Sequence, residues 1–201
     1  MSGIGIPRWK GLSIGIFSLF LIMFCIQTWL RIDVWKDSET LMTDMIEKNK
    51  EVTDCAYLYW LRGNARVGDG NIDDAVQDYN EAIREHHSYI EAYSNRGAAH
   101  FQQGNVVAAI RDYDTSILYS PNHAKSYYNR ASGKATIGDF PGALADYNHF
   151  LLLDPNDKQA YVDRGMVRLT LKDSTGACDD WKKAVSLGNE NALQFVQQIC
   201  K

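Results

Sequence analysis

The chain has 201 residues, of which 45% are hydrophobic and 23% charged, so it is not disordered throughout and has room for one domain plus an appendage. Residues 1–30 contain two basic side chains, Arg8 and Lys10, and no acidic one, which leaves 19 basic and 25 acidic side chains in the rest. An acidic folded part repels nucleic-acid phosphates, and no basic stripe offsets this, so nucleic acid is excluded as a partner.

The first predicted element is a membrane-spanning helix at residues 11–30. This segment, GLSIGIFSLFLIMFCIQTWL, contains no charged residue. As a helix it would span about 30 Å, which matches the hydrocarbon core of a bilayer. Trp9 and Trp29 flank it, and such rings favour the headgroup region. We therefore expect an uncleaved single-pass anchor.

Two other readings of this segment remain open. A cleaved signal peptide would need a shorter apolar core and small residues before the cut, and Thr28, Trp29 and Leu30 do not supply them. A lipid on Cys25 would need a small residue in place of Phe24.

The charges beside the span favour one orientation. Arg8, Lys10 and the amino terminus precede it, so the positive-inside rule predicts a cytoplasmic N-terminus at residues 1–10. Basic residues also follow the span, mixed with acidic ones, and this weakens the argument from charge: Arg31, Lys36, Lys48 and Lys50.

Residues 31–55 are expected to link the span to the folded part through a helix at 38–49. This helix, SETLMTDMIEKN, starts at Ser38, a residue type common at helix N-caps.

From residue 56 onward the sequence repeats every 34 residues, through four copies without an insertion. This period predicts four structural units, at 56–89, 90–123, 124–157 and 158–188. Seven columns keep the period: Tyr59, Tyr93, Tyr127 and Tyr161; Arg62, Arg96, Arg130 and Arg164; Gly63, Gly97, Ala131 and Gly165; Ala75, Ala109, Ala143 and Ala177; Asp78, Asp112, Asp146 and Asp180; Tyr79, Tyr113, Tyr147 and Trp181; Ile83, Ile117, Leu151 and Val185.

Each unit reads as two antiparallel helices. Tyr59, Gly63 and Val67 lie four residues apart, and residues 72–83 show an i, i+3, i+4 apolar stripe. A turn signal at 68–71, Gly-Asp-Gly-Asn, separates the two stripes. One such pair cannot bury its apolar face alone, so the units are expected to stack on a continuous core.

These columns resemble the tetratricopeptide repeat (TPR), and residues 92–97, AYSNRG, are similar to a common bacterial variety. The resemblance covers residues 56–189 and implies an all-α TPR solenoid that acts as a non-catalytic scaffold for a protein or peptide partner. The departures from the pattern are His87 and Asn189 in place of the closing Pro, Lys172 in place of the turn Gly, and Phe150 in place of a small residue. We expect Phe150 to separate the second and third units or to fill a gap there.

Residues 189–201 are expected to form a capping helix with one apolar face, because terminal repeats need such a lid. Cys178 and Cys200 lie at similar distances before and after the turn at 187–189, so antiparallel helices would bring them together. They are candidates for a disulfide in an oxidising compartment, and two separate buried thiols are the alternative.

No catalytic, metal or cofactor site is predicted, and we expect the chain not to be an enzyme. The histidines form no i, i+4 ligand pair, and no glycine-rich phosphate loop follows a strand. The Asp column recurs once per unit, so its carboxylates are expected to pair locally with arginines such as Arg62 and Arg96.

The resemblance implies that peptide contacts come from one face of each first helix. Of the Lys, Asn and Arg clamp that the chaperone-tail binding subfamily uses for a terminal carboxylate, only Asn64 is matched in this register, so a terminal carboxylate is not the expected ligand. The aromatic members instead indicate a groove for an apolar or extended segment, unless they only pack against neighbouring helices. The candidate groove residues are Tyr57, Trp60, Asn64, Glu91, Ser94, Phe101, Lys125, Tyr128, Ser132, Val162 and Met166.

Residues 31–41, RIDVWKDSETL, resemble the junction between the last span and the TPR tail of multi-span glycosyltransferases. The other spans and the acidic catalytic loops of those enzymes are absent from this sequence, so the activity is not carried over. The resemblance implies a periplasmic TPR array on a bacterial inner membrane. It leaves open a second reading, an accessory or detached tail module of a membrane glycosyltransferase system.

Overall fold

The computed structural model describes residue 23 and residues 37–49 and 54–200. Apart from Met23, the predicted span at 11–30 lies outside these residues. Within the part that is described, no helix is both long and apolar enough to cross a bilayer.

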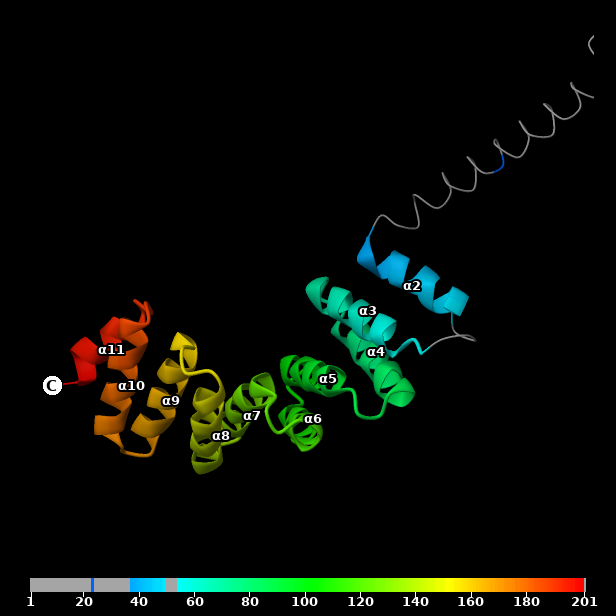
Figure 1. Cartoon of the computed structure of the whole chain (residues 1–201). Helices are drawn as coiled ribbons and strands as arrows, with labels where there is room; N and C mark the ends of the chain where they lie inside the picture. The colour runs from blue at the N-terminus through cyan, green and yellow to red at the C-terminus, as the bar shows by residue number, and fades with distance from the viewer. Residues whose placement is uncertain (1–22, 24–36, 50–53, 201) are drawn as a thin grey trace, which may run out of the picture.

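The described residues form ten helices and no strand (Figure 1). Helix α2 precedes four helix pairs, α3/α4 to α9/α10, and α11 follows them. Their bounds are α2 Ser38–Asn49, α3 Ala56–Gly68, α4 Ile72–Glu85, α5 Ile90–Gln102, α6 Val106–Tyr119, α7 Ala124–Thr136, α8 Phe140–Leu153, α9 Lys158–Thr170, α10 Ser174–Ser186 and α11 Ala192–Ile199.

Each helix packs against the next one in the chain, and the first helices also approach one another, α3 against α5 and α5 against α7. We call the surface that α3, α5, α7 and α9 present together the inner face. Helices α7 and α9 approach each other less closely than the two preceding pairs do. The inner face is therefore more open between the third and fourth units.

The glycine and aromatic columns explain why the two helices of a unit cross so closely. A Cβ atom added to Gly97 would lie 2.7 Å from Cε1 of Tyr113, and one added to Gly63 would lie 2.7 Å from Cε1 of Tyr79. Both tyrosine rings are fully buried. The ring of the second helix thus occupies the space that the missing side chain leaves, and this contact recurs along the array.

The turn between the helices of a unit requires a left-handed backbone conformation. Gly70, Gly104 and Gly138 have φ values of 82°, 80° and 83° at this point. Lys172 adopts the same conformation in the fourth unit, with φ 66°. A side chain disfavours this conformation by about 1–2 kcal/mol, so packing of the fourth pair must outweigh a local cost.

Phe150 fills a different junction from the one predicted. It lies on α8, is 6% exposed, and belongs to a buried cluster with Ala160, on α9. Its ring centroid is 5.2 Å from that of Tyr128. The second helix of a unit packs its far side on the next unit, so Phe150 lies between the third and fourth units. The expectation that it would lie between the second and third units was wrong.

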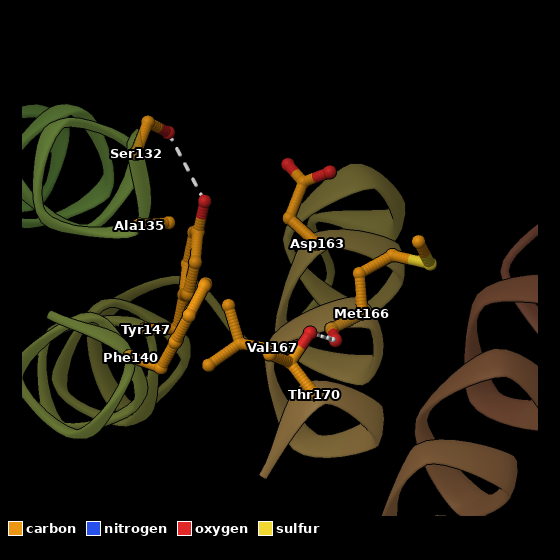
Figure 2. A pocket seen from close by; sticks show the side chains of 8 residues that line it. All are labelled: Ser132, Ala135, Phe140, Tyr147, Asp163, Met166, Val167 and Thr170. Carbon is orange, nitrogen blue, oxygen red and sulfur yellow. Dashed lines mark hydrogen bonds between the residues drawn. The ribbon is translucent and has the colours of Figure 1, made fainter. Parts of the chain in front are cut away.

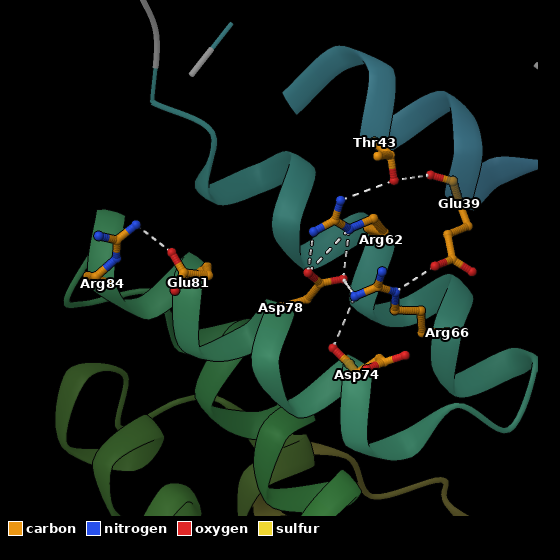
Figure 3. Close-up of polar contacts among 8 residues, drawn as sticks. All are labelled: Glu39, Thr43, Arg62, Arg66, Asp74, Asp78, Glu81 and Arg84. Atoms are coloured by element: carbon orange, nitrogen blue, oxygen red, sulfur yellow. Dashed lines mark hydrogen bonds and ion pairs between the residues drawn. The ribbon is translucent and has the colours of Figure 1, made fainter. Parts of the chain in front are cut away.

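Helix α2 covers the start of the array. Ile46 is buried in one cluster with Tyr59 of α3. Arg62 Nη1 donates to Thr43 Oγ1 at 3.1 Å, and Arg66 Nε donates to Glu39 Oε1 at 2.8 Å (Figure 3). These contacts attach the helix to the first unit in the way that a preceding repeat would.

Helix α11 covers the other end. Phe195 stacks on the buried Trp181 of α10, with ring centroids 5.1 Å apart. Cys178 on α10 and Cys200 just after α11 form a disulfide, with Cα atoms 5.6 Å apart. The last unit is thus closed by an aromatic contact and a covalent link.

Candidate functional site

The repeated Arg and Asp columns form a ladder of ion pairs along the array. Arg96 Nη2 lies 2.6 Å from Asp112 Oδ1, and the same pair forms in every unit. The other terminal nitrogen reaches back to the preceding unit, where Arg96 Nη1 donates to Asn80 Oδ1 at 2.6 Å. The four aspartates are 2% to 6% exposed. These carboxylates are structural, since each forms an ion pair with an arginine inside the array.

One cluster combines a histidine with serine hydroxyls. His123 Nδ1 lies 2.8 Å from Ser126 Oγ, which donates to Ser116 Oγ at 2.8 Å. Both serines have no exposed surface, and burial lowers the pKa of His123 below its usual value. The cluster closes the loop between the second and third units, and its hydroxyls cannot meet a substrate.

The start of the inner face is aromatic. Tyr57 is 58% exposed and stacks on Trp60 with ring centroids 5.6 Å apart, and Trp60 also approaches Tyr89. The indole Nε1 of Trp60 is buried and has no hydrogen-bond partner within the described part of the chain. This group therefore offers an apolar surface beside an unused donor.

The predicted groove residues differ in their accessibility. Glu91 and Lys125 are exposed, Phe101 and Val162 are half-buried, and Ser94 is 1% exposed. Ser94 therefore lies beneath the inner face, although its register position belongs to the groove set. Its neighbour in the chain, Asn95, reaches the surface instead.

The first polar pocket lies where α3, α5 and α7 meet, and we call it the Asn64 pocket. Asn64 Oδ1 accepts hydrogen bonds from Tyr79 Oη at 2.8 Å and from Asn95 Nδ2 at 2.7 Å. Asn95 Oδ1 in turn accepts from Lys125 Nζ at 2.9 Å. The pocket has a volume of 260 Å³ and is lined by Asn64, Val67, Tyr79, Asn95, Ala98, Ala99, Gln102 and Lys125.

Lys125 is the only charged group in this pocket. No carboxylate among the described residues pairs with it. With amides beside it, the ammonium group makes the Asn64 pocket electropositive and rich in N–H donors.

The predicted groove register did not include Asn95, because Asn95 lies one position after Ser94, which the register uses. A signal was present: Asn95, Ala98 and Gln102 are spaced i, i+3 and i+7, so they share one helix face.

The second pocket lies between α7, α8 and α9, and we call it the Asp163 pocket (Figure 2). Asp163 Oδ2 accepts a hydrogen bond from Tyr128 Oη at 2.7 Å, and its Oδ1 accepts from Gln159 Nε2 at 2.9 Å. Burial, followed by this bond to Asp163, raises the pKa of Tyr128 above its usual range. The pocket has a volume of 310 Å³ and is lined by Ser132, Ala135, Phe140, Tyr147, Asp163, Met166, Val167 and Thr170.

The structure thus brings the predicted residues Asn64 and Lys125 to one pocket, and Ser132 and Met166 to another. Tyr128 supports the second pocket by its bond to Asp163. In the part of the chain that is described, no group of three or more potential metal ligands occurs.

Comparisons with known families give the repeat its name. A model described as TPR repeat matches residues 63–104, and one described as Tetratricopeptide repeat matches residues 90–123. Residues 63–123 thus match tetratricopeptide-repeat models. No curated protein matches the chain.

Solved TPR proteins have a similar fold. The crystal structure of MamA superimposes with a TM-score of 0.70, and the match covers 81% of this chain and 95% of the MamA chain, with 19% sequence identity. The Arabidopsis OM64 TPR domain is 27% identical, with a TM-score of 0.56 over 57% of this chain and 95% of its own. The first TPR of Spaghetti (RPAP3), bound to the HSP90 peptide SRMEEVD, is 21% identical, with a TM-score of 0.58 over 58% and 93%. The described part of the chain thus has the fold of a TPR array.

Proposed function

We propose that the chain is a membrane-anchored TPR scaffold that holds an extended segment of a protein partner on its inner face. The observation that supports this most strongly is the Asn64 pocket, where polar side chains from three successive first helices converge. A solenoid needs no such hydrogen-bonded row for its own packing, because the apolar columns already fill its core.

The chemistry of the Asn64 pocket favours a carboxylate of the partner. Lys125 supplies an ammonium group, and the amide of Asn95 supplies a further donor at the same place. Charge-assisted hydrogen bonds of this kind are stronger than neutral ones. The peptide held by the Spaghetti TPR also ends in a carboxylate-bearing residue. The groove register matched only Asn64 of the carboxylate clamp, whereas the structure places Asn95 and Lys125 beside it.

The aromatic group at the start of the inner face would contact apolar side chains of the same segment. Tyr57 and Trp60 present a large, stiff surface, which costs little conformational entropy when it binds. The remaining candidate groove residues, Glu91, Phe101 and Val162, would line the path between these contacts.

Binding can be tested with the full chain in detergent micelles and two pools of random heptapeptides, one with a free C-terminal carboxylate and one amidated. We expect selective binding of the free-acid pool, and at least about tenfold weaker binding by Lys125→Met, because a hydrogen bond to a charged group contributes about 1.5–3 kcal/mol. Lys183→Met, an exposed change on α10, is the charge-matched control and should bind like the wild type. Equal binding of both pools, or none, would refute a carboxylate-binding groove.

The anchor and its orientation are part of the proposal. Residues 11–30 carry no charge, and the Cys178–Cys200 disulfide agrees with an oxidising compartment such as the bacterial periplasm. We expect the chain to stay with the inner membrane after alkaline washing, and the array to be digested when protease is added to spheroplasts. Release by the wash would contradict the anchor, and protection from the protease would contradict the periplasmic placement.

A second candidate function is an accessory or detached tail module of a membrane glycosyltransferase system. The similarity of residues 31–41 to the span–tail junction of such enzymes favours it. Purification of the chain from mild detergent would recover a polytopic glycosyltransferase in equal amount under this proposal. A different stoichiometric partner would exclude it.

A further inference from the structure

We propose that the Asp163 pocket receives a lysine or arginine side chain of the segment whose carboxylate lies in the Asn64 pocket. The inner face would then select partners by the order and spacing of an acidic and a basic group. This inference rests on the proposed function and adds to it the chemistry of the second contact.

Asp163 differs from the four ladder aspartates, Asp78, Asp112, Asp146 and Asp180, in pairing with no cation among the described residues. The ladder aspartates each pair with an arginine, whereas Asp163 accepts only from the neutral Tyr128 and Gln159, and no ion pair within the described part of the chain includes it. A carboxylate offers about four acceptor positions, so about two remain for a ligand. A half-buried carboxylate with unused acceptor positions attracts a cation more strongly than one in bulk water.

The rest of the pocket fits a long side chain with an apolar stem and a charged end. Ala135, Phe140 and Val167 supply apolar surface, and Figure 2 shows Asp163 standing above Val167 on the same helix. Lysine and arginine side chains place their methylene groups on such surface while the charged end reaches a polar group.

The hydroxyl groups in the pocket favour a donor over an acceptor. Thr170 Oγ1 donates to the carbonyl oxygen of Met166 at 3.0 Å. Ser132 Oγ donates to the carbonyl oxygen of Tyr128 at 3.2 Å, and with that proton used it accepts from Tyr147 Oη at 3.0 Å, which leaves one lone pair. Their protons are used inside the helices, so their oxygens present lone pairs to the pocket. An acidic ligand would meet these lone pairs and the charge of Asp163 together.

The two pockets share helix α7, and this fixes their spacing. Ser132 and Ala135 follow Lys125 by seven and ten residues on α7, which corresponds to about 10–15 Å along the helix. Perpendicular to α7, the two pockets are separated by about one interhelical distance, about 8–10 Å. The resulting separation of about 13–18 Å corresponds to about four to six residues of an extended peptide.

The test uses decapeptide pools with a free C-terminal Asp, one fixed lysine at each upstream position in turn, and norleucine at that position in the matched pools. For the full chain in micelles we expect lysine to improve binding at least tenfold, about 1.4 kcal/mol, when it lies about four to six residues before the terminal Asp.

Variants separate this inference from the proposed function. Asp163→Asn keeps an acceptor for Tyr128 and should lose the preference for lysine over norleucine. Asp163→Lys should prefer glutamate at the same position. Asp179→Asn, an exposed change of equal charge on α10, should behave like the wild type. Lys125→Met should weaken binding of every pool and keep the preference for lysine.

Three results would overturn the inference. Equal binding of lysine and norleucine pools at every position, or a preference that survives in Asp163→Asn, would refute the Asp163 pocket as a site for a basic side chain and leave the proposed carboxylate site at the Asn64 pocket intact. Failure of the wild type to bind any pool would refute the groove and this inference with it.

Discussion

The distance between the helices of each repeat depends on a single pair of residues. In three units a glycine of the first helix faces an aromatic ring of the second, and the third unit has Ala131 in that position. The aromatic ring occupies the space that the absent glycine side chain leaves, so a change at either residue should alter the packing of both helices of the unit.

Gly97→Ala should therefore destabilise the array. The added Cβ would lie 2.7 Å from Tyr113 Cε1 and 3.1 Å from the carbonyl oxygen of Ala109, so the helices must move apart. Overpacking of this kind costs about 1–3 kcal/mol. Denaturant unfolding measures the loss. Gly68→Ala is the control, because no atom lies within 4 Å of its added Cβ, and an equal effect of both changes would contradict the packing argument.

His123 should make the stability of the array depend on pH. Burial lowers its pKa in the folded chain, while a smaller effect of Glu91 raises it and one of Lys125 lowers it. As the pH falls below about 6.5, the unfolded chain binds a proton that the folded chain does not bind until a lower pH, so stability decreases. His123→Gln should lower the melting temperature at neutral pH, because the variant loses the hydrogen bond to Ser126. Its melting temperature should then decrease less than that of the wild type when the pH is lowered. An identical decrease for variant and wild type would refute this.

At the scale of the helices, the ion-pair ladder joins each unit to the one before it. The second cation beside each buried aspartate varies along the array: Lys134 Nζ lies 2.8 Å from Asp146 Oδ2, whereas Arg96 is the one cation among the described residues that pairs with Asp112. The arginine–aspartate ion pairs should therefore differ in how much stability is lost when the arginine is replaced.

Arg96→Met should destabilise the fold by about 3–5 kcal/mol, because it leaves the buried carboxylate of Asp112 unpaired. Arg130→Met should cost less, since Lys134 still pairs with Asp146. Replacing Arg96 and Asp112 together by Met and Leu should recover much of the loss. Unfolding midpoints compare the three. Equal losses for the two single variants would show that the second cation is irrelevant.

The disulfide should hold α11 on the last unit. Cys178 and Cys200 are separated by 22 residues, and closing a loop of this length stabilises a fold by about 3 kcal/mol. Reductant should lower the unfolding midpoint of the wild type and leave that of Cys178→Ser with Cys200→Ser unchanged. No effect of reductant on the wild type would contradict the linkage.

At the scale of the whole molecule, the repeat and the TPR fold were predictable because local period determines both. The helix pairs follow from spacings within 34 residues, and the turns of the first three units follow from Gly70, Gly104 and Gly138, whereas Lys172 takes that position in the fourth. Contacts between units were harder to predict: Phe150 was assigned to the wrong junction because the sequence does not say which side of a second helix faces the next unit. Asn95 and Asp163 were missed for a related reason, since their role depends on neighbours about 30 residues away.

The structure also changes how the inner face is interpreted. The sequence indicated an aromatic groove, and the aromatic group at Tyr57 and Trp60 occupies only its start. Further along, an electropositive pocket and a carboxylate-containing pocket succeed each other across α7. A partner that matches both would bind in one direction only, which suits a scaffold that must orient what it recruits.

Site-specific photo-cross-linking in cells tests the central claim, a partner held on the inner face, most directly. A benzophenone side chain placed at Gln102, in the Asn64 pocket, should yield one discrete adduct with a partner protein. The same probe at Val107, which is 61% exposed on α6, should yield none. An adduct of the same mass from both positions, or from Val107 alone, would contradict the account.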